Sequence, residues 1–270
     1  MDLPSVVIHD QSGFASTHFA QAAGIIETIQ PRVDVDNCNP GIEKGNVRQI
    51  SAYLFTNVPF WPDGTIFISF VGTGRPVAVK FKNGSILLSP DNGTCTMCAG
   101  ILGISEARFL SEEFGTDGWQ MPRCAARLAD GMDFSEVGPE VPGNRVVLYK
   151  IPAARISEGR AEGEVSMLLK NFGNLTFSIG TDEFENTGIR HGDRVRVTFT
   201  RDGKVEWKGE MTFQPSFGYV PEGDPVIFNG SSGYMDIGLN RRHFINKCLP
   251  QILDAQDPGE FKVLIEKIGD

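Results

Sequence analysis

The sequence predicts an α/β domain followed by an all-β domain. Strand-like and helix-like segments alternate through about the first half of the chain, which indicates a mainly parallel sheet with flanking helices. Helical periodicity then stops in the segment 131–145, where Gly, Pro and acidic residues are concentrated. Short β-type runs separated by turns follow, and they predict a small antiparallel barrel or sandwich. We therefore expect one domain over 1–140 and a second over 146–270.

The elements of the first domain follow from hydrophobic spacing. Continuous apolar runs that end in polar or glycine-rich loops predict buried strands, and apolar residues three or four apart predict helices. Asn83–Gly84 separates two of the strands and accepts the positive φ angles of a tight hairpin turn. The expected strands are Ser5–Ile8, Val33–Val35, Ile66–Ile68, Val77–Phe81, Ile86–Leu88 and Leu102–Phe109, and the expected helices are Phe19–Ile29, Val47–Phe55 and Pro122–Ala129.

The second domain is expected to consist of short strands with a helical tail. Turns such as Asp202–Gly203 separate its β-type runs. From Phe244 onward the apolar residues fall at helical spacing, so we expect a helical tail that packs against the body. The expected strands are Val146–Tyr149, Glu164–Leu169, Leu175–Ile179, Arg194–Thr200, Lys204–Met211, Val226–Phe228 and Tyr234–Leu239.

Charge and composition narrow the classes of partner. A formal net charge of -9 argues against nucleic acid, which requires a clustered basic surface. No apolar run approaches the roughly 20 residues that span a bilayer, and the first ten residues lack the pattern of a signal peptide. The five cysteines are scattered, as is typical of reduced thiols. We expect a cytoplasmic protein that binds neither nucleic acid nor membrane.

The stretch 65–93 places two glycine-rich corners at strand ends. The first corner, Gly72–Arg75, lets backbone amides approach a ligand, and the second is Ser89–Gly93. In open α/β sheets ligands lie beyond the strand ends, so these corners predict a binding site. Arg75 has two interpretations of equal weight: it holds an anion or a polarised oxygen, or it forms a salt bridge at the sheet edge.

Other reactive side chains carry weaker signals. Cys95 and Cys98 have the spacing of a redox motif or half a zinc site, but no second ligand pair matches them, so buried structural thiols are expected and no metal. The four histidines, His9, His18, His191 and His243, are isolated in sequence, and each is interpreted as a surface or capping residue rather than a catalyst.

Two turns of the second domain combine groups that suit a purine. Asn171–Asn174 and Ser231–Gly233 join an aromatic ring, an amide and hydroxyl groups to glycine turns. An aromatic ring stacks on a base, and an amide pairs with a base edge. From these residues alone, two ordinary β-turns with polar tips remain the favoured interpretation.

Taken together, these segments resemble the family of S-adenosylmethionine hydrolases, also called hydroxide adenosyltransferases, and the related fluorinase and chlorinase. The resemblance implies an N-terminal α/β domain, a C-terminal β-barrel and a homotrimer whose adenosyl sites lie between the N-domain of one subunit and the C-domain of the next. It also implies no cofactor, because S-adenosylmethionine is the substrate. The matching blocks, in order, are TIFISFVGTGRPVAV, LLSPDNG, ARLADGMDFSEVG, NFGNL and VPEGDPVIFNGSSGYMDIGLN.

The resemblance assigns roles residue by residue. Phe172 and Phe217 would flank the adenine, and Asn174 would form a hydrogen bond with it. Ser231 and Ser232 would meet the carboxylate of the methionine. The remaining candidates are Arg75 and Asp10 as catalytic residues, and Gln11, Asn37, Thr73, Asp91 and Asn92 as substrate-binding residues.

The chain departs from the family pattern where chemistry is expected. Ile68 stands at the position of an aspartate credited with activating water, and Thr116–Trp119 occupies the region of its partner histidine. Asn37 replaces a further histidine, and Leu169 or Lys170 replaces the carboxylate that would bind the methionine amine. Isoleucine cannot accept a proton, so the fold is better supported than the reaction.

Two classes of function remain. The first is an S-adenosylmethionine hydrolase in which water attacks the ribose C5′ and releases adenosine and methionine, with Asp10, Asp91 or Asp117 in place of the lost acid. The sulfonium is already a good leaving group, so positioning and desolvation can supply much of the rate. The alternative is a catalytically inactive protein that binds adenosine or another nucleoside. A third hypothesis is a pocket refitted for a substrate without the amino-acid tail.

Overall fold

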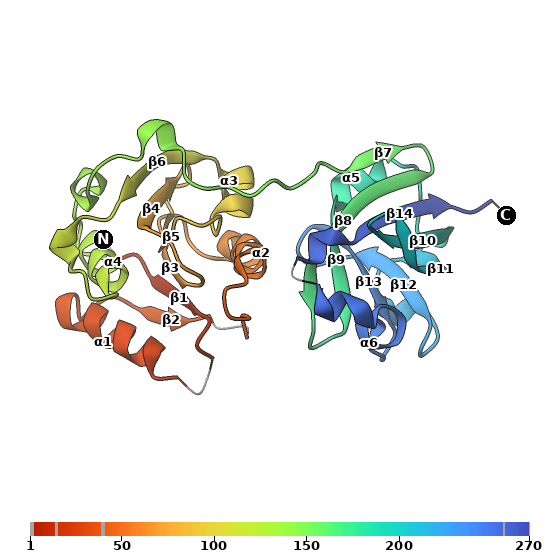
Figure 1. Cartoon of the computed structure of the whole chain (residues 1–270), viewed down its shortest axis with the longest axis horizontal. Coiled ribbons are helices and arrows are strands. Elements are labelled where there is room, and N and C mark those ends of the chain that lie inside the picture. The colour runs from red at the N-terminus through yellow and green to blue at the C-terminus, as the bar shows by residue number, and fades with distance from the viewer. Residues whose placement is uncertain (1–2, 14–15, 39–40, 256, 270) are drawn as a thin grey trace. The chain divides into compact units, whose positions relative to one another are not determined.

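The structure, a computed structural model, describes residues 3–13, 16–38, 41–255 and 257–269. The chain divides into two units, Met1–Tyr149 and Lys150–Asp270, each of which has its own core. The expected organisation, an α/β domain followed by a β-barrel, is confirmed (Figure 1).

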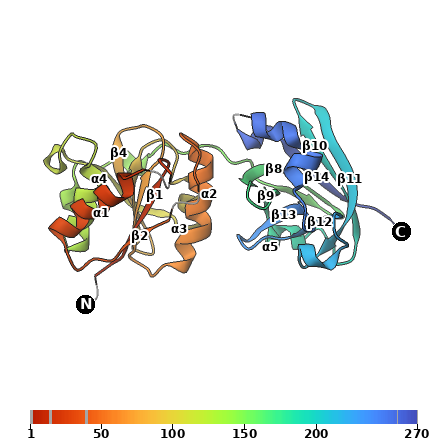
Figure 2. The ribbon, with the colours of Figure 1, turned by 90° about the horizontal axis from the view of Figure 1, so that it is seen from below.

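The first unit is a three-layer α/β sandwich. Its sheet has the strand order β2-β1-β3-β5-β4-β6, with parallel pairing from β2 to β5 and antiparallel pairing at β4 and β6. Helices α1 and α4 lie on one face, and α2 and α3 lie on the other (Figure 2). The elements are β1 (Val6–Asp10), α1 (His18–Ile29), β2 (Val35–Asn37), α2 (Val47–Asn57), β3 (Ile66–Phe70), β4 (Pro76–Phe81), β5 (Ile86–Pro90), α3 (Thr96–Leu102), β6 (Ile104–Phe109) and α4 (Gln120–Ala129).

The central strands are continuous apolar runs because helices cover both of their faces. On β1, Val6 and Ile8 join the core under α1 and α4, whereas Val7 joins the core under α2 and α3. Two predicted boundaries were wrong by about two residues. The second strand begins at Val35 rather than Val33, and β6 begins at Ile104 because Leu102 still belongs to α3.

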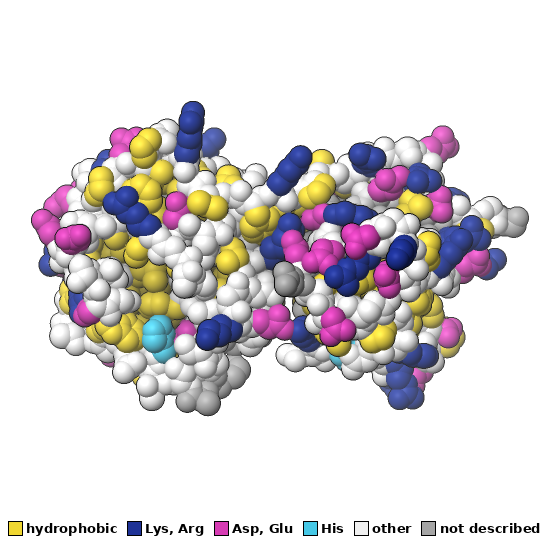
Figure 3. Space-filling view, in the orientation of Figure 1, with side chains coloured by type: hydrophobic (Ala, Val, Ile, Leu, Met, Phe, Trp, Pro, Cys, Tyr) yellow, Lys and Arg dark blue, Asp and Glu magenta, His cyan; other side chains and the backbone are white. Residues whose placement is uncertain are grey.

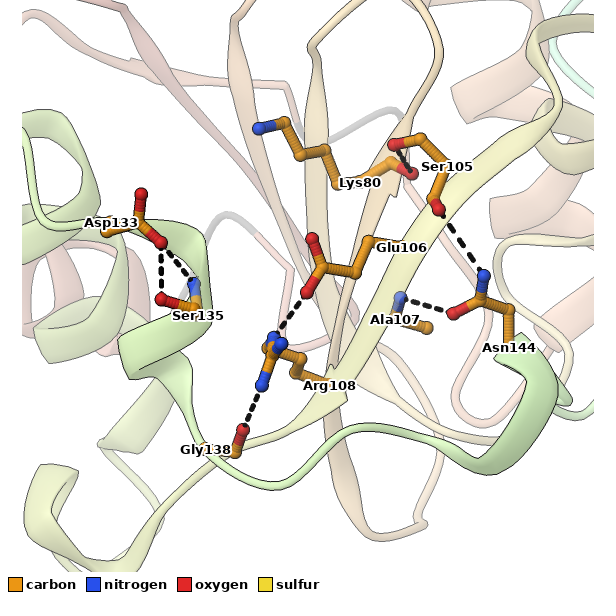
Figure 4. A network of polar contacts seen from close by, with 9 residues as sticks. All are labelled: Lys80, Ser105, Glu106, Ala107, Arg108, Asp133, Ser135, Gly138 and Asn144. Carbon is orange, nitrogen blue, oxygen red and sulfur yellow. Dashed lines mark hydrogen bonds and ion pairs between the residues drawn. The ribbon is translucent and has the colours of Figure 1, made fainter.

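A polar network fastens the segment that follows α4 to the edge strand β6 (Figure 4). Arg108 donates through Nε to Glu106 at 2.5 Å and through Nη1 to the carbonyl of Gly138 at 2.9 Å. Asn144 accepts a hydrogen bond from the amide of Ala107 at 2.9 Å. These contacts cover an exposed strand edge and explain why residues beyond 140 belong to the first unit. The expected strand Val146–Tyr149 is wrong, since those residues have no regular structure.

The second unit is a closed barrel. Its strand order is β14-β10-β11-β12-β13-β9-β8, and pairing of β14 with β8 closes the ring, while β7 extends β8. All pairs are antiparallel except β11 with β12. The elements are β7 (Arg155–Ser157), β8 (Arg160–Leu169), β9 (Asn174–Gly180), α5 (Thr181–Glu185), β10 (Arg194–Arg201), β11 (Lys204–Gln214), β12 (Pro225–Asn229), β13 (Tyr234–Leu239), α6 (Phe244–Cys248) and β14 (Lys262–Lys267).

The prediction of a helical tail was wrong for its last part. Helix α6 covers only Phe244–Cys248, and Lys262–Lys267 forms the strand that closes the barrel. Phe261, Val263 and Ile265 point into the barrel core at a spacing of two residues. The helical prediction arose because Phe261, Leu264 and Ile265 also satisfy a spacing of three and four.

Candidate functional site

Three loops of the first unit meet at one edge of the sheet. Strands β1, β3 and β5 are parallel, so their carboxyl ends, at Asp10, Phe70 and Pro90, lie at the same edge. Strand β4 runs the other way, and Pro76 pairs with Pro90, which brings the Gly72–Arg75 corner to this edge as well. Ligands of open α/β sheets bind beyond such an edge.

The side chain of Gln11 links two of these loops. Its Oε1 atom accepts hydrogen bonds from the backbone amide of Gly45 at 2.6 Å and from that of Gly72 at 3.2 Å. Gly72 has a φ angle of +75°, and a Cβ atom there would lie 2.7 Å from Nδ2, the side-chain amide nitrogen of Asn92. Only glycine fits this corner without strain. Gln11, a predicted substrate-binding residue, therefore shapes the loop edge.

Asp91 and Asn92 hold the second corner in place. Asn92 donates to the carbonyl of Val71 at 3.0 Å, and its Oδ1 atom accepts from the hydroxyl of Thr94 at 2.7 Å. Asp91 accepts from the amide of Val147 at 2.7 Å through its carboxylate, and its own amide donates to the carbonyl of Arg75 at 2.8 Å. The two residues lie where they were expected, and these bonds give them a structural role.

Asp10 faces His18, which was interpreted from the sequence as a surface or capping residue. The Oδ2 atom of Asp10 lies 3.2 Å from Nδ1 of His18, in contact but not aligned as a hydrogen bond. Its Oδ1 atom accepts from the amide of Ser12 at 2.9 Å. The side chain of Asp10 is 2% exposed and that of His18 is 30% exposed. The ring of His18 packs edge-on against Phe70 and lies 4.7 Å from the ring of Trp119, between centroids.

The neighbouring His9 points to the opposite face of the sheet. It is fully buried, and burial lowers the pKa of its imidazole to about 4, so the ring is neutral at pH 7. Among the described residues, neither ring nitrogen has a hydrogen-bond partner, and the same holds for the hydroxyl of Ser69, which His9 faces across β1 and β3. His9 was interpreted as a surface or capping residue, and this prediction was wrong.

Arg75 stands apart from Asp10, whereas Asn37 lies on the strand next to β1, where it pairs with Ile8. Arg75 precedes β4, which is three places from β1, and its guanidinium lies 3.8 Å from the centroid of the Phe109 ring. It therefore makes a cation–π contact. Asn37 ends the edge strand β2 and is exposed, as is Thr73.

Asp117, the other acidic candidate, is held by an arginine, and Ile68, at the position of the lost acid, lies within the core. The exposed Asp117 forms a bidentate ion pair with Arg123 at 2.7 Å, which holds the pKa of its carboxyl well below its usual range. Ile68 is fully buried in the core under α1 and α4.

The cysteine pair behaves as buried structural thiols. Cys95 lies at the start of α3, yet burial raises the pKa of both Cys95 and Cys98 to about 12, so neither is a thiolate at pH 7. All five cysteines are free. Within the described ranges, no three His, Cys, Asp or Glu side chains are grouped so as to hold a metal ion, and no helix there is long and apolar enough to cross a bilayer.

In the second unit a turn supported by His243 presents Phe172. The ring of His243 supports this turn: its Nε2 atom bonds to the carbonyl of Lys170 at 2.8 Å, and its Nδ1 atom accepts from the amide of Asn246 at 3.2 Å. The turn needs glycine at 173, where φ is +75°. Phe172 is 73% exposed, which leaves its face available for stacking on a planar ligand.

The remaining predicted residues of this unit surround the outer face of β13. Asn174 packs over the backbone of Gly238, and Phe217 packs edge-on against Phe228 of β12 with 49% of its surface exposed. Ser231 and Ser232 lie in the turn that joins β12 to β13, with Ser231 exposed and Ser232 half-buried.

Sequence reasoning missed Asp236 on the same outer face. It pairs with Thr176 across β13 and β9 and with Phe228 across β13 and β12. It is 5% exposed, the backbone of Gly230 lies directly over its carboxyl group, and burial raises its pKa to about 6. A signal was available, because the alternation Met235–Asp236–Ile237 places a lone acid between two core residues.

The fold defines a class of two-domain proteins in which an α/β sandwich is followed by a closed barrel and loops gather at the edge of the sheet. A protein of known structure belongs to the same class. A crystal structure of an uncharacterized conserved protein from Thermotoga maritima superposes with a TM-score of 0.82 and 22% identity, and the match covers 96% of this chain and 99% of the other. This likeness shows the fold.

The family follows from sequence comparison. Residues 10–138 match the SAM hydroxide adenosyltransferase N-terminal domain, and residues 167–248 match the C-terminal domain. The chain belongs to the SAM hydroxide adenosyltransferase family. It is 29% identical to an (R)-S-adenosyl-L-methionine hydrolase of Thermus thermophilus over 85% of this chain and 89% of the relative. It is 26% identical to a fluorinase of Actinopolyspora mzabensis over 88% of this chain and 91% of the relative.

Proposed function

We propose that this protein binds S-adenosylmethionine and hydrolyses it to adenosine and methionine. The observation that carries the proposal is the convergence of the loops after β1, β3 and β5 at one edge, in a chain that belongs to the SAM hydroxide adenosyltransferase family. Water is the nucleophile that the family name and the hydrolase relative imply. Arg75 remains a proposed contact of the substrate, because its exposed guanidinium is fixed over Phe109 at this edge.

The second unit supplies groups suited to the nucleoside. Phe172 offers an exposed ring on a turn fixed by His243, and Asn174 offers an amide on the adjoining strand. We propose that these two residues, with Phe217, Ser231 and Ser232, contact the substrate in a homotrimeric assembly. Light scattering coupled to size exclusion tests the assembly, and a monomer mass at micromolar protein would contradict it.

Calorimetry and product analysis test the proposed function together. Purified protein is titrated with S-adenosylmethionine and with adenosine, and the reaction mixture is separated by chromatography. Binding with equimolar release of adenosine and methionine is the expected result. Absence of binding of either compound to folded protein would refute the proposal.

A second candidate is a protein that binds the nucleoside without cleaving it. One observation favours it: Ile68, at the position of the lost acid, is fully buried in the core and cannot orient water. Tight binding of S-adenosylmethionine without adenosine release would select this candidate. We also propose a cytoplasmic location on the basis of the five free thiols.

Replacing Asn174 with alanine is expected to weaken adenosine binding about tenfold, because it removes one hydrogen-bonding group, worth about 1.5 kcal/mol, from the proposed contact with the base. Asn171→Ala is the matched control, since Asn171 is exposed on the same turn but is assigned no contact with the base. Titration calorimetry measures both variants. Equal affinities of the two variants would remove Asn174 from the proposed site.

A further inference from the structure

Asp10 and His18 bring together the two groups of an acid–base dyad, although the contact is not aligned as a hydrogen bond; such catalytic bonds often align only when substrate binds. A buried carboxylate lies 3.2 Å from one nitrogen of an imidazole that is 30% exposed. In such a pair the carboxylate orients the imidazole and favours the tautomer that carries its proton on the facing nitrogen. The other nitrogen, Nε2, is then free to accept a proton.

The chain fixes both partners by different means. Asp10 ends β1, and its second oxygen is held by the amide of Ser12 at 2.9 Å. His18 is the first residue of α1, and its ring is fixed by Phe70, at 4.5 Å between centroids, and by Trp119. Phe70 ends β3 immediately before the first glycine corner. The ring of His18 therefore lies at the sheet edge where the loops converge.

Two aromatic rings, those of Phe70 and Trp119, pack against the imidazole of His18, and Asp10 is the charged group that the described residues place in contact with it. Hydrophobic side chains gather over α1 and α4 in the space-filling view (Figure 3). A shallow hollow next to Trp119 is lined by Ala20, Gln21, Gly24, Ile25, Thr28 and Ile29 of α1 and by Arg123 of α4. Arg123 is paired with Asp117. The aromatic rings shield part of the contact between Asp10 and His18 from competing water.

We propose that His18 is the general base of the reaction, oriented by Asp10, in place of the acid that Ile68 has displaced. This inference rests on the proposed function. Nε2 of His18 removes a proton from a water molecule while the water oxygen forms a bond to C5′ of the adenosyl group. The bond between C5′ and sulfur breaks, and the sulfonium sulfur takes the electron pair to become the neutral thioether of methionine. The products are adenosine, methionine and the imidazolium of His18, which returns its proton to solvent.

Kinetics of His18→Gln test the proposal. General-base catalysis contributes about 10²–10⁴-fold, so kcat is expected to fall at least about 100-fold while the calorimetric affinity for S-adenosylmethionine changes less than about threefold. Asp10→Asn is also expected to lower kcat, because the asparagine no longer orients the imidazole of His18. His191→Gln is the matched control, because His191 is an exposed histidine of the barrel with no assigned role. Turnover of His18→Gln at the wild-type rate would overturn the proposal.

A second readout does not depend on turnover. Long-range ¹H–¹⁵N NMR of the neutral His18 ring is expected to show the Nδ1–H tautomer in the wild-type protein and loss of this preference in Asp10→Asn. A wild-type ring in the Nε2–H tautomer would overturn the proposal. Failure of the proposed function is distinguishable, because it appears as wild-type protein that releases no adenosine, whereas failure of this inference alone appears as undiminished turnover by His18→Gln.

Discussion

Replacing Gly173 with alanine is expected to destabilise the barrel unit by about 3 kcal/mol, the range of severe single substitutions. Two effects add. Gly173 has a φ angle of +75°, which costs other residues about 1 kcal/mol or more. A Cβ atom there would also overlap the ring of His243, and this ring cannot retreat because it bonds to Lys170 and to the amide of Asn246.

Urea unfolding of Gly173→Ala and Gly188→Ala measures the two effects separately. Gly188 has a φ angle of +73°, but a Cβ atom added there would have no neighbour within 4 Å, so this variant reports the backbone cost alone. The expected loss at Gly188 is about 1 kcal/mol. Adenosine affinity should fall in Gly173→Ala, since the turn carries Phe172 and Asn174. Equal losses of stability in the two variants would show that His243 does not hold this turn.

Replacing the carboxyl of Asp236 is expected to abolish a loss of stability that the wild-type protein undergoes as the pH rises. The pKa of this group is about 6 in the folded protein and 3.8 in its ordinary state, because burial disfavours the charge. The folded state therefore binds more protons than the unfolded state between these values, and stability falls as the pH rises through this window. With 1.36 kcal/mol for each pKa unit, the loss is complete above about pH 6 and amounts to about 3 kcal/mol.

Denaturant unfolding of the wild type and Asp236→Asn at pH 4 and at pH 7.5 tests this expectation. The free energy of unfolding of Asp236→Asn, relative to wild type, should rise by about 2.4 kcal/mol between the two pH values, because a small part of the loss has already occurred at pH 4. Asp224→Asn is the control, because Asp224 is exposed in the loop before β12. A difference between Asp236→Asn and wild type that does not change with pH would contradict the account of a buried, uncompensated carboxylate.

Local patterns were enough to predict most of the fold. The alternation of apolar runs and helical spacing predicted α1, α2 and α4, and the glycine corners predicted the ends of β3 and β5. The prediction for the tail failed because Phe261, Leu264 and Ile265 also fit the helical spacing of three and four, and pairing with β8 decides in favour of a strand. Such long-range pairing is a tertiary effect that a local window does not contain.

The candidate site was predicted less completely. The corners that contain Gly72 and Asn92 were found because they stand at strand ends, where sequence position alone indicates the sheet edge, whereas Gln11 was found through the family resemblance. The contact between Asp10 and His18 depends on how the end of β1 and the start of α1 meet in space, and Trp119 joins them from a distant segment. The residues next to His18 in the sequence do not reveal these contacts, so the pair becomes visible only in the folded structure.

The most direct test of the account is a hydrolysis assay in water enriched in ¹⁸O. The protein is incubated with S-adenosylmethionine, and the released adenosine is examined by mass spectrometry. The account predicts adenosine that carries one ¹⁸O atom at its 5′ position, together with an equal amount of methionine. Folded protein that releases no adenosine above the blank, or releases adenosine without the label, would contradict it.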